Sequence, residues 1–454
     1  MHIIIIGAGD VGRELARRLS AKQQEIVVVD RDPQKVKQLS QELDLPVITG
    51  NGANLEVLHK ANISKARMLI AVTESDEINI IACMLAKTMG MKYTVARIRN
   101  PESAGDIDID TRGLIQAQVG IDVIISPEKA VAQEIAKAIH WPEASEVEYY
   151  ADGRVMLMAV YLAALAESEQ QPLQDFALPA GCSVVGLMKT DGKFILPEAD
   201  TMLSGGDKVY LAGRVAAVGK AGRMLHGSKT SIKRVIILGG GLIGYTLASI
   251  LEGEKEHSYT VKIIEKDEKR VDELNRKLGK SIVLQGDGSD ISYFNEEEIA
   301  EADVLVAATG DDRTNMVASV MGLKRGVAKV ISEVTRIGYG PIYEAIGITD
   351  TINPHLITAS RILKFSRGED VLVLDLLKDE VAESMELVLP AGAEVLGKNI
   401  TQAGFPKGLR VAAIVRDDEV IIPDDDITLT AGDHLIIFAV PKVCSRLGSY
   451  FVCE

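Results

Sequence analysis

The sequence has little of what marks secreted, metal-binding or membrane-spanning proteins. Four of its 454 residues are cysteines, and none of them stands in a CxxC pair or at the spacing of metal ligands. Cysteines in this pattern indicate reduced thiols in a cytosolic protein. The longest apolar run covers residues 155–166 and is shorter than the ~20 residues that a membrane-spanning helix needs. We therefore expect a cytoplasmic protein without a metal site, and any membrane role must come through a partner protein.

An excess of positive charge is lacking as well. The chain has 50 Lys and Arg residues against 65 Asp and Glu residues, which gives a net charge of −15. Because an acidic chain repels phosphodiester backbones and anionic lipid headgroups, no nucleic acid is expected as a partner. With 47% hydrophobic and 25% charged residues, the composition is that of a soluble globular protein, and the length allows about three or four domains.

What the sequence does contain is an internal duplication. Residues 3–12, IIIIGAGDVG, recur as VIILGGGLIG at 235–244. A different segment, LPAGCSVVGL at 178–187, recurs as LPAGAEVLGK at 389–398. The chain is therefore organised as a larger unit, a smaller unit, and then both again.

The larger units alternate runs of Ile and Val with helical patterns, which predicts a parallel sheet buried on both faces. The predicted fold class is α/β, with two Rossmann-like doubly wound parallel-sheet domains, each followed by a small α+β module. The expected domains are a first Rossmann-like domain (1–125), a crossover helix (126–141), a small module (142–225), a linker (226–232), a second Rossmann-like domain (233–352), a crossover helix (353–368) and a second small module (369–454).

Each GxGxxG motif follows an apolar strand and opens a helix, as a dinucleotide-binding turn requires. The first glycine allows the tight turn, the second lets the backbone approach a pyrophosphate, and the third lets the helix pack on the strand. The helix N-terminus then offers unpaired N–H groups to phosphate. The predicted cofactor-binding residues of the two turns are Gly7, Ala8, Gly9, Asp10, Val11 and Gly12, and Gly239, Gly241, Leu242, Ile243 and Gly244.

An acidic residue ends the next strand in each copy. Asp30 follows Gly12 by 18 residues, and Glu265 follows Gly244 by 21, close to the ~20 of the dinucleotide fingerprint. A carboxylate at this position accepts hydrogen bonds from ribose hydroxyls and repels a 2′-phosphate. The expected ligand is therefore NAD+ or NADH rather than NADP.

Four further polar residues are candidate ligand contacts because they stand at or after strand ends. Thr73 and Thr309 end the fourth strand of their units, where the open edge of a doubly wound sheet meets its ligand. Asn51 and Asp287 follow the third strand and could line the adenosine side. The alternatives are ordinary strand-end hydroxyls and plain turn residues.

The two copies differ in charge at one aligned position, where Arg97 corresponds to Glu333. An arginine at the end of a strand can pair with additional phosphate charge, whereas a glutamate repels it. The hypothesis is that the first site also accepts ATP or ADP, while the second prefers NAD or is degenerate. The alternative is that Arg97 makes only a surface salt bridge.

No catalytic constellation accompanies these turns. The seven histidines stand in no HExxH or other catalytic spacing, and no Walker A motif is present. A dehydrogenase needs a substrate-positioning cation and a proton donor facing the nicotinamide, and the sequence assigns neither. These absences predict a binding protein rather than an enzyme, with an NAD-dependent oxidoreductase as an alternative.

The duplicated glycine turns, each followed by an LPAG module, resemble the tandem members of the RCK/KTN regulatory family over essentially the whole chain. The resemblance implies a cytoplasmic regulatory subunit, peripheral on the inner face of the cell inner membrane, that forms a homotetrameric ring and gates a membrane K+-translocating subunit of the Trk type. It implies a non-catalytic switch driven by NAD+, NADH or adenine nucleotides, and small modules that are RCK C-domains. Glu333 departs from the family pattern, which puts the equivalence of the two sites in doubt. A further alternative for the function is a sensor of redox or energy state that acts on a soluble partner. The residues that match the family motif are Gly7, Gly9, Gly12, Asp30, Thr73 and Arg97, and Gly239, Gly241, Gly244, Glu265 and Thr309.

Overall fold

The computed structural model shows two compact units. The Rossmann unit comprises Met1–Ile139 and Ile232–Ser366, and the small-module unit comprises His140–Ser231 and Arg367–Glu454. None of the helices in the described part of the chain is both long and apolar enough to span a bilayer. The structure describes residues 2–21, 24–99, 120–163, 171–227, 232–254, 257–288, 301–365, 371–376, 382–424, 426–440 and 443.

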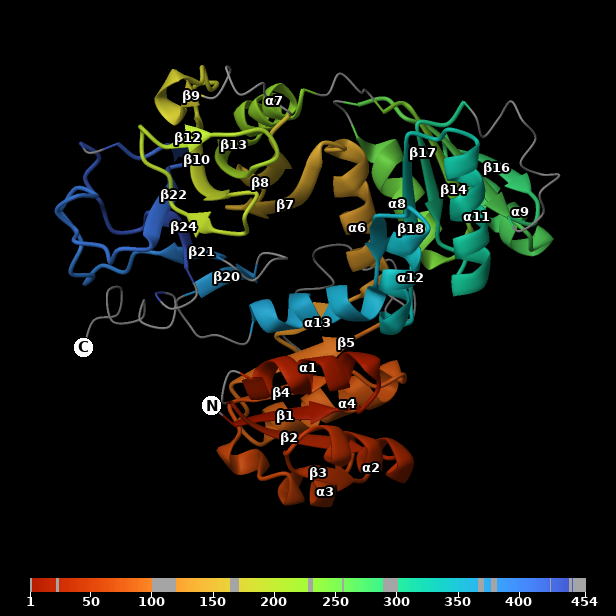
Figure 1. Cartoon of the computed structure of the whole chain (residues 1–454). Coiled ribbons are helices and arrows are strands. Elements are labelled where there is room, and N and C mark those ends of the chain that lie inside the picture. Colours follow the sequence, from red (N-terminus) through yellow and green to blue (C-terminus); the bar gives the residue numbers. More distant parts are fainter. Residues whose placement is uncertain are drawn as a thin grey trace. The chain divides into compact units, whose positions relative to one another are not determined.

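Each Rossmann domain is built on a six-stranded parallel sheet (Figure 1). The strand order is β3-β2-β1-β4-β5-β6 in the first domain and β16-β15-β14-β17-β18-β19 in the second. In both sheets the chain runs outward to one edge and then crosses to the other, so the prediction of doubly wound sheets is confirmed. The strands are β1 (His2–Ile6), β2 (Glu25–Asp30), β3 (Val47–Thr49), β4 (Met68–Ala71), β5 (Tyr93–Arg97) and β6 (Val123–Ile125), then β14 (Arg234–Leu238), β15 (Thr260–Glu265), β16 (Ile282–Gln285), β17 (Val304–Ala307), β18 (Lys329–Glu333) and β19 (Asp350–Ile352).

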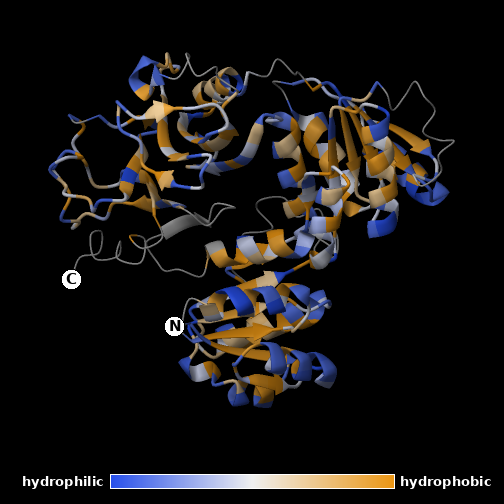
Figure 2. Cartoon of the chain, viewed as in Figure 1, coloured by the Kyte–Doolittle hydropathy of each residue, from blue (hydrophilic) through white to orange (hydrophobic). Residues whose placement is uncertain are grey.

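Helices cover these sheets with their apolar faces turned inward (Figure 2). In the first domain Val11, Leu15 and Leu19 of α1 lie in one core with the central strands, as their spacing of four predicts. Capping side chains start several helices: Asp32 accepts the Gln34 N–H group before α2. The helices are α1 (Asp10–Ala21), α2 (Pro33–Glu42), α3 (Leu55–Lys60), η1 (Ile63–Lys65) and α4 (Asp76–Thr88), then α8 (Leu242–Gly253), α9 (Glu268–Lys277), α11 (Asp312–Lys324), η5 (Ile337–Tyr339) and α12 (Gly340–Ala345).

The two crossover helices are exchanged between the Rossmann domains. Helix α6 (Pro127–His140) follows the first sheet, but its Val131 and Ile135 lie in the core of the second domain. Helix α13 (Pro354–Lys364) follows the second sheet, and its Ile362 lies in the core of the first domain, where α13 packs along α1. Each domain therefore completes the core of the other, which joins the two into one unit.

The small modules have five-stranded antiparallel sheets of order β11-β10-β13-β8-β7 and β20-β21-β24-β22-β23. Tyr210 and Phe438 share one buried cluster, and the Tyr150 hydroxyl lies 2.6 Å from Ser384 Oγ, so the two modules pack as one body. The α+β prediction is confirmed for the first module, which carries α7. The elements are β7 (Ala144–Tyr150), β8 (Val155–Tyr161), β9 (Gln171–Pro172), η4 (Leu173–Asp175), β10 (Cys182–Met188), β11 (Phe194–Ile195), β12 (Met202–Leu203), β13 (Lys208–Arg214) and α7 (Val215–His226), then β20 (Val371–Leu376), β21 (Glu383–Val388), β22 (Leu409–Arg416), β23 (Glu419–Ile421) and β24 (His434–Ala439).

The segment expected as a linker begins inside a helix. Helix α7 runs to His226, and Gly227 ends it in the left-handed conformation with φ of 70°. Residues 228–231 of the expected linker lie outside the described residues.

Candidate functional site

The glycine turn of the first Rossmann domain links β1 to α1 in a conformation that needs its glycines. Gly7 has φ of 111°, and a Cβ atom on Gly12 would stand 1.8 Å from the Gly7 carbonyl oxygen. A Cβ atom on Gly9 would meet no other atom of the chain within 4 Å. The turn therefore packs tightly on the protein side at Gly12 and leaves the space beside Gly9 open for a ligand.

The acid at the end of β2 fixes this turn. Asp30 Oδ2 accepts a hydrogen bond of 2.6 Å from the Ala8 N–H group, and Oδ1 accepts one of 2.8 Å from the Asp32 N–H group. Hydrogen bonds from backbone N–H groups to a carboxylate are charge-assisted and strong. Asp30 therefore holds the Gly-rich turn in shape, a role that the sequence did not indicate.

The ends of β4 and β5 are tied together by Asn79, a fully buried residue of α4. Its Oδ1 accepts hydrogen bonds from the Thr73 N–H and hydroxyl groups at 2.9 and 2.7 Å. Its Nδ2 donates to the Arg97 carbonyl oxygen at 2.8 Å. Asn79 was not among the predicted site residues, and the only signal for it was its recurrence as Asn315. The Thr73 hydroxyl is thus engaged within the chain, at the edge where a ligand would lie.

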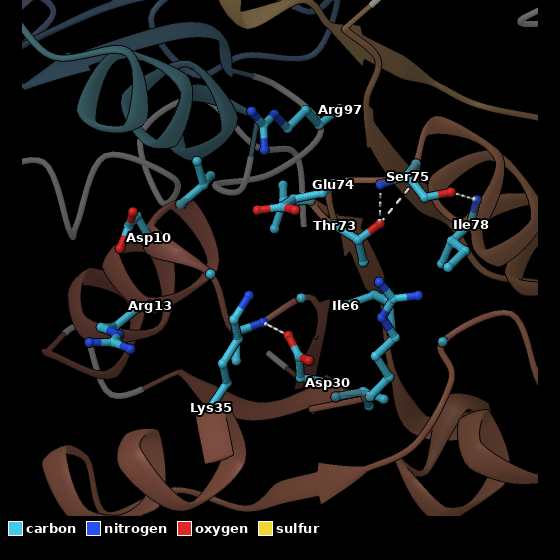
Figure 3. Close-up of a pocket in the computed structure, with 18 of the residues that line it drawn as sticks. Ile6, Asp10, Arg13, Asp30, Lys35, Thr73, Glu74, Ser75, Ile78 and Arg97 are labelled. Atoms are coloured by element: carbon cyan, nitrogen blue, oxygen red, sulfur yellow. Dashed lines mark hydrogen bonds between the residues drawn. The ribbon is translucent and has the colours of Figure 1, made fainter. Parts of the chain in front are cut away.

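These elements enclose a pocket with a volume of about 240 Å³ (Figure 3). Figure 3 shows Asp30 on one side of the pocket and Arg97 on the other, with Thr73 and Glu74 between them. The predicted residues that line it are Gly7, Ala8, Gly9, Asp10, Val11, Asp30, Asn51, Thr73 and Arg97, whereas Gly12 packs behind the turn.

The pocket is positively charged although the chain is acidic. Five lining residues are cations and three are carboxylates, namely Arg13, Arg31, Lys35, Arg97 and Arg99 against Asp10, Asp30 and Glu74. Arg97 is only 8% exposed, and its Nε atom has no hydrogen-bond partner. Burial lowers the pKa of Arg97, and the neighbouring Arg99 lowers it further. A buried guanidinium with an unpaired N–H group is suited to an anion, because an unsatisfied buried donor costs free energy.

The second Rossmann domain repeats this geometry. Gly239 has φ of 101°, and a Cβ atom on Gly244 would stand 2.0 Å from the Gly239 carbonyl oxygen. Glu265 Oε2 accepts a hydrogen bond of 2.7 Å from the Gly240 N–H group, as Asp30 does from Ala8. Asn315 accepts hydrogen bonds from the Thr309 N–H and hydroxyl groups at 3.0 and 2.7 Å.

Other features of the second turn differ. Arg270 Nε donates a hydrogen bond of 2.7 Å to the Gly240 carbonyl oxygen, so this cation is held by the turn itself. Gly241, Leu242 and Asp287 are exposed, and Ile243 packs at the margin of the core. The structure therefore brings the second-domain residues to the same strand edge, and there the turn itself engages Arg270.

Glu333 replaces Arg97 at the end of β18 and changes the charge of the second site. It is 5% exposed, and its Oε2 atom has no hydrogen-bond partner. Burial raises the pKa of Glu333 to about 7, with a further contribution from Asp312 and Glu128 and an opposing hydrogen bond from the Gly310 N–H group. Around neutral pH this carboxyl group is therefore only partly ionised, and its charged form disfavours phosphate.

Comparison with known proteins finds two domain families, each of which matches the chain twice. The TrkA-N domain family matches residues 3–127 and 235–354, and the TrkA-C domain family matches residues 157–226 and 385–452. The chain is 34% identical to "Trk system potassium uptake protein TrkA homolog 1" of Methanosarcina mazei, over 99% of this chain and 100% of the relative. It is 32% identical to "Trk system potassium uptake protein TrkA" of Halomonas elongata, over 97% and 96%.

Solved structures share the fold across both units. "Crystal Structure of the GsuK RCK domain" matches with a TM-score of 0.61 and 18% identity, covering 99% of this chain and 94% of that one. "GsuK channel bound to NAD" matches with the same TM-score and identity, covering 99% and 78%. At this identity the likeness establishes the fold alone.

Proposed function

Because the chain belongs to the TrkA family, with its TrkA-N and TrkA-C domains each present twice, we propose that it is the regulatory subunit of a potassium uptake system. In this proposal it binds NAD+ or NADH and adenine nucleotides in its Rossmann domains and converts binding into a change of conformation. It carries out no reaction. Its relatives, which match over nearly their whole length, are named Trk system potassium uptake proteins, and these names support a role in potassium uptake.

The observation that carries the ligand proposal is the positively charged pocket on the first glycine turn. A dinucleotide pyrophosphate would lie over Gly9, beside the N-terminus of α1, where N–H groups point at the ligand. Arg97, with its unpaired Nε atom, would receive further phosphate charge. The fit is therefore good for an anionic nucleotide, and the NAD bound to the GsuK channel is a ligand of the same class.

We propose that the two Rossmann domains differ in ligand preference. The first pocket takes NAD(H) and also ATP or ADP, because Arg97 lies where additional phosphate charge would be placed. The second domain takes NAD(H) or no nucleotide, because a buried Glu333 lies at the corresponding strand end. The ligand-contacting residues proposed are those predicted from the glycine turns and strand ends. Of these, Gly12 and Gly244 act by letting the turns pack, and Asp30 and Glu265 act partly through the turns that they hold.

A ligand can act as a switch only if it binds two conformations with different affinity. The exchanged crossover helices offer such a coupling, because α13 packs against α1, which begins at the first pocket. In the proposal, four copies of the chain form a homotetrameric ring on the inner face of the cell inner membrane. The ring transmits the change to a membrane K+-translocating subunit of the Trk type.

Purification of the native complex tests this function. The chain should be recovered together with a multi-span membrane protein, and the purified complex should transport K+ at a rate that changes at least about twofold when NADH or ATP is added. Recovery with a soluble partner alone would instead indicate a redox or energy sensor. Consumption of NADH with a small-molecule substrate would indicate an oxidoreductase. A Gly9→Asp variant serves as the matched control, because the added carboxylate repels phosphate in the first pocket.

A further inference from the structure

The first pocket contains a residue from the other Rossmann domain. Of the described residues that line it, His355 alone comes from the second half of the chain. It is the second residue of α13, the helix that crosses over to pack on α1. The pocket is therefore complete only when the second domain has placed α13 on the first.

The backbone of His355 is held in place by residues of the second Rossmann domain. Asn353 caps α13, and its Oδ1 accepts hydrogen bonds from the His355 and Leu356 N–H groups at 2.9 and 3.0 Å. The Asn353 Nδ2 atom donates to the Val334 carbonyl oxygen at 2.7 Å, which fixes the cap to the segment after β18. The position of the imidazole in the first pocket is consequently set by the position of the second domain.

At the pocket the imidazole meets groups of both signs. Its Nε2 atom lies 3.6 Å from Asp10 Oδ2, at the first residue of α1. Arg97 faces it from the end of β5, Arg99 from two residues further along the chain, and Asp312 from the N-terminus of α11. The side chain is 24% exposed, so it is accessible to a ligand in the pocket.

We propose that His355 contacts the terminal phosphates of a nucleotide in the first pocket, so that the second Rossmann domain senses the phosphate charge of that ligand directly. The inference rests on the proposed function, in which the first pocket binds nucleotides. His355 lies beside Asp10 at the N-terminus of α1 and within electrostatic reach of Arg97, so a phosphate chain that runs from α1 toward Arg97 would pass close to it. ATP brings more charge to this place than the pyrophosphate bridge of NAD, so His355 distinguishes the two ligands.

Binding of ATP should also be accompanied by uptake of a proton. Burial lowers the pKa of the His355 imidazole, and Arg97 and Arg99 lower it further against the opposing effect of Asp10. The N-terminus of α13 also disfavours a positive charge at this position. Phosphate oxygens beside the ring would favour the imidazolium and raise its pKa. The uptake should be largest at pH values between the lowered pKa of the imidazole in the free protein and its raised pKa in the bound state.

Calorimetric titration of the full chain with ATP and NAD+ at pH 6.5, in two buffers of different ionisation enthalpy, measures both affinity and proton uptake. We expect His355→Gln to weaken ATP binding about tenfold, to change NAD+ binding less than about twofold, and to reduce proton uptake. His355→Lys, which carries a permanent charge, should keep the ATP affinity and lose the uptake. His59→Gln, in an exposed residue of α3 outside the pocket, is the matched control and should behave as wild type. Because the terminal phosphate of ATP itself titrates near pH 6, the uptake is compared between variants rather than read from wild type alone.

The outcomes separate the inference from the function on which it rests. Absence of ATP and NAD+ binding by the wild-type protein would overturn the proposed ligand of the first pocket, and this inference with it. If wild type binds both ligands and His355→Gln equals it in ATP affinity and proton uptake, the inference about His355 is overturned and the proposed ligand of the pocket is not. Equal weakening of ATP and NAD+ by both His355 variants would also overturn it, because such a result reflects loosened packing of α13.

Discussion

Replacing Gly12 by alanine should destabilise the Rossmann unit by about 3 kcal/mol or more. The added Cβ atom would stand 1.8 Å from the Gly7 carbonyl oxygen and 2.9 Å from its carbonyl carbon. These are backbone atoms in a turn that Gly7 already makes with a positive φ, so the turn must open to admit the methyl group. Chemical denaturation followed by circular dichroism measures the loss.

Gly9→Ala, three residues earlier, is the matched control and should behave in the opposite way. Its Cβ atom meets nothing in the chain within 4 Å, so the free energy of unfolding should change by less than about 0.5 kcal/mol. The methyl group would nevertheless fill space that a pyrophosphate needs, and nucleotide affinity should fall about tenfold or more. A stable Gly12→Ala protein, or a Gly9→Ala protein with unchanged nucleotide affinity, would contradict the account of this turn.

Replacing Glu333 by glutamine should stabilise the protein at pH 8 by about 1–3 kcal/mol and have almost no effect at pH 4.5. The folded protein holds this pKa at about 7, above the ordinary value of 4.5. Below pH 4.5 the carboxyl group is protonated in both the folded and unfolded states, so its ionisation does not change the free energy of unfolding. As pH rises toward 7, the unfolded state ionises first, and the cost of the buried group grows until it is complete above pH 7.

Glutamine retains the shape of Glu333 and can still accept the hydrogen bond from the Gly310 N–H group. Denaturation curves at both pH values give the free energies of unfolding. Glu344→Gln, at an exposed position of α12 in the same domain, is the control and should leave them unchanged. A Glu333→Gln protein that is less stable than wild type at pH 8 would show that the carboxylate has a stabilising partner.

Much of the fold follows from local patterns in the chain. Val11, Leu15 and Leu19 lie one helical turn apart directly after the glycine motif, and all three are buried against the sheet as their spacing predicts. The motif itself requires a strand before it and a helix after it, and both are present twice. Because these signals lie within short stretches of sequence, the doubly wound sheets could be predicted without knowledge of distant contacts.

What depends on distant contacts could not be predicted. The apolar faces of α6 and α13 show that each helix is buried, but an amphipathic face does not specify which sheet covers it. The exchange of these helices, and with it the place of His355 in the first pocket, therefore required the structure. Asp30 was predicted from its spacing to the glycines, yet its hydrogen bond to the Ala8 N–H group depends on the three-dimensional shape of the turn.

We expect the first pocket to be a nucleotide site whose ligand preference differs from that of the second domain. Calorimetric titration of wild type, Gly9→Asp, Gly241→Asp and Arg97→Glu with NAD+, NADH and ATP tests it most directly. We expect Gly9→Asp to abolish ATP binding and Gly241→Asp to leave it intact. Arg97→Glu should weaken ATP binding by at least about tenfold and NAD+ binding much less. Tight binding that none of the variants alters, or ATP binding that survives both Gly9→Asp and Arg97→Glu, would contradict it.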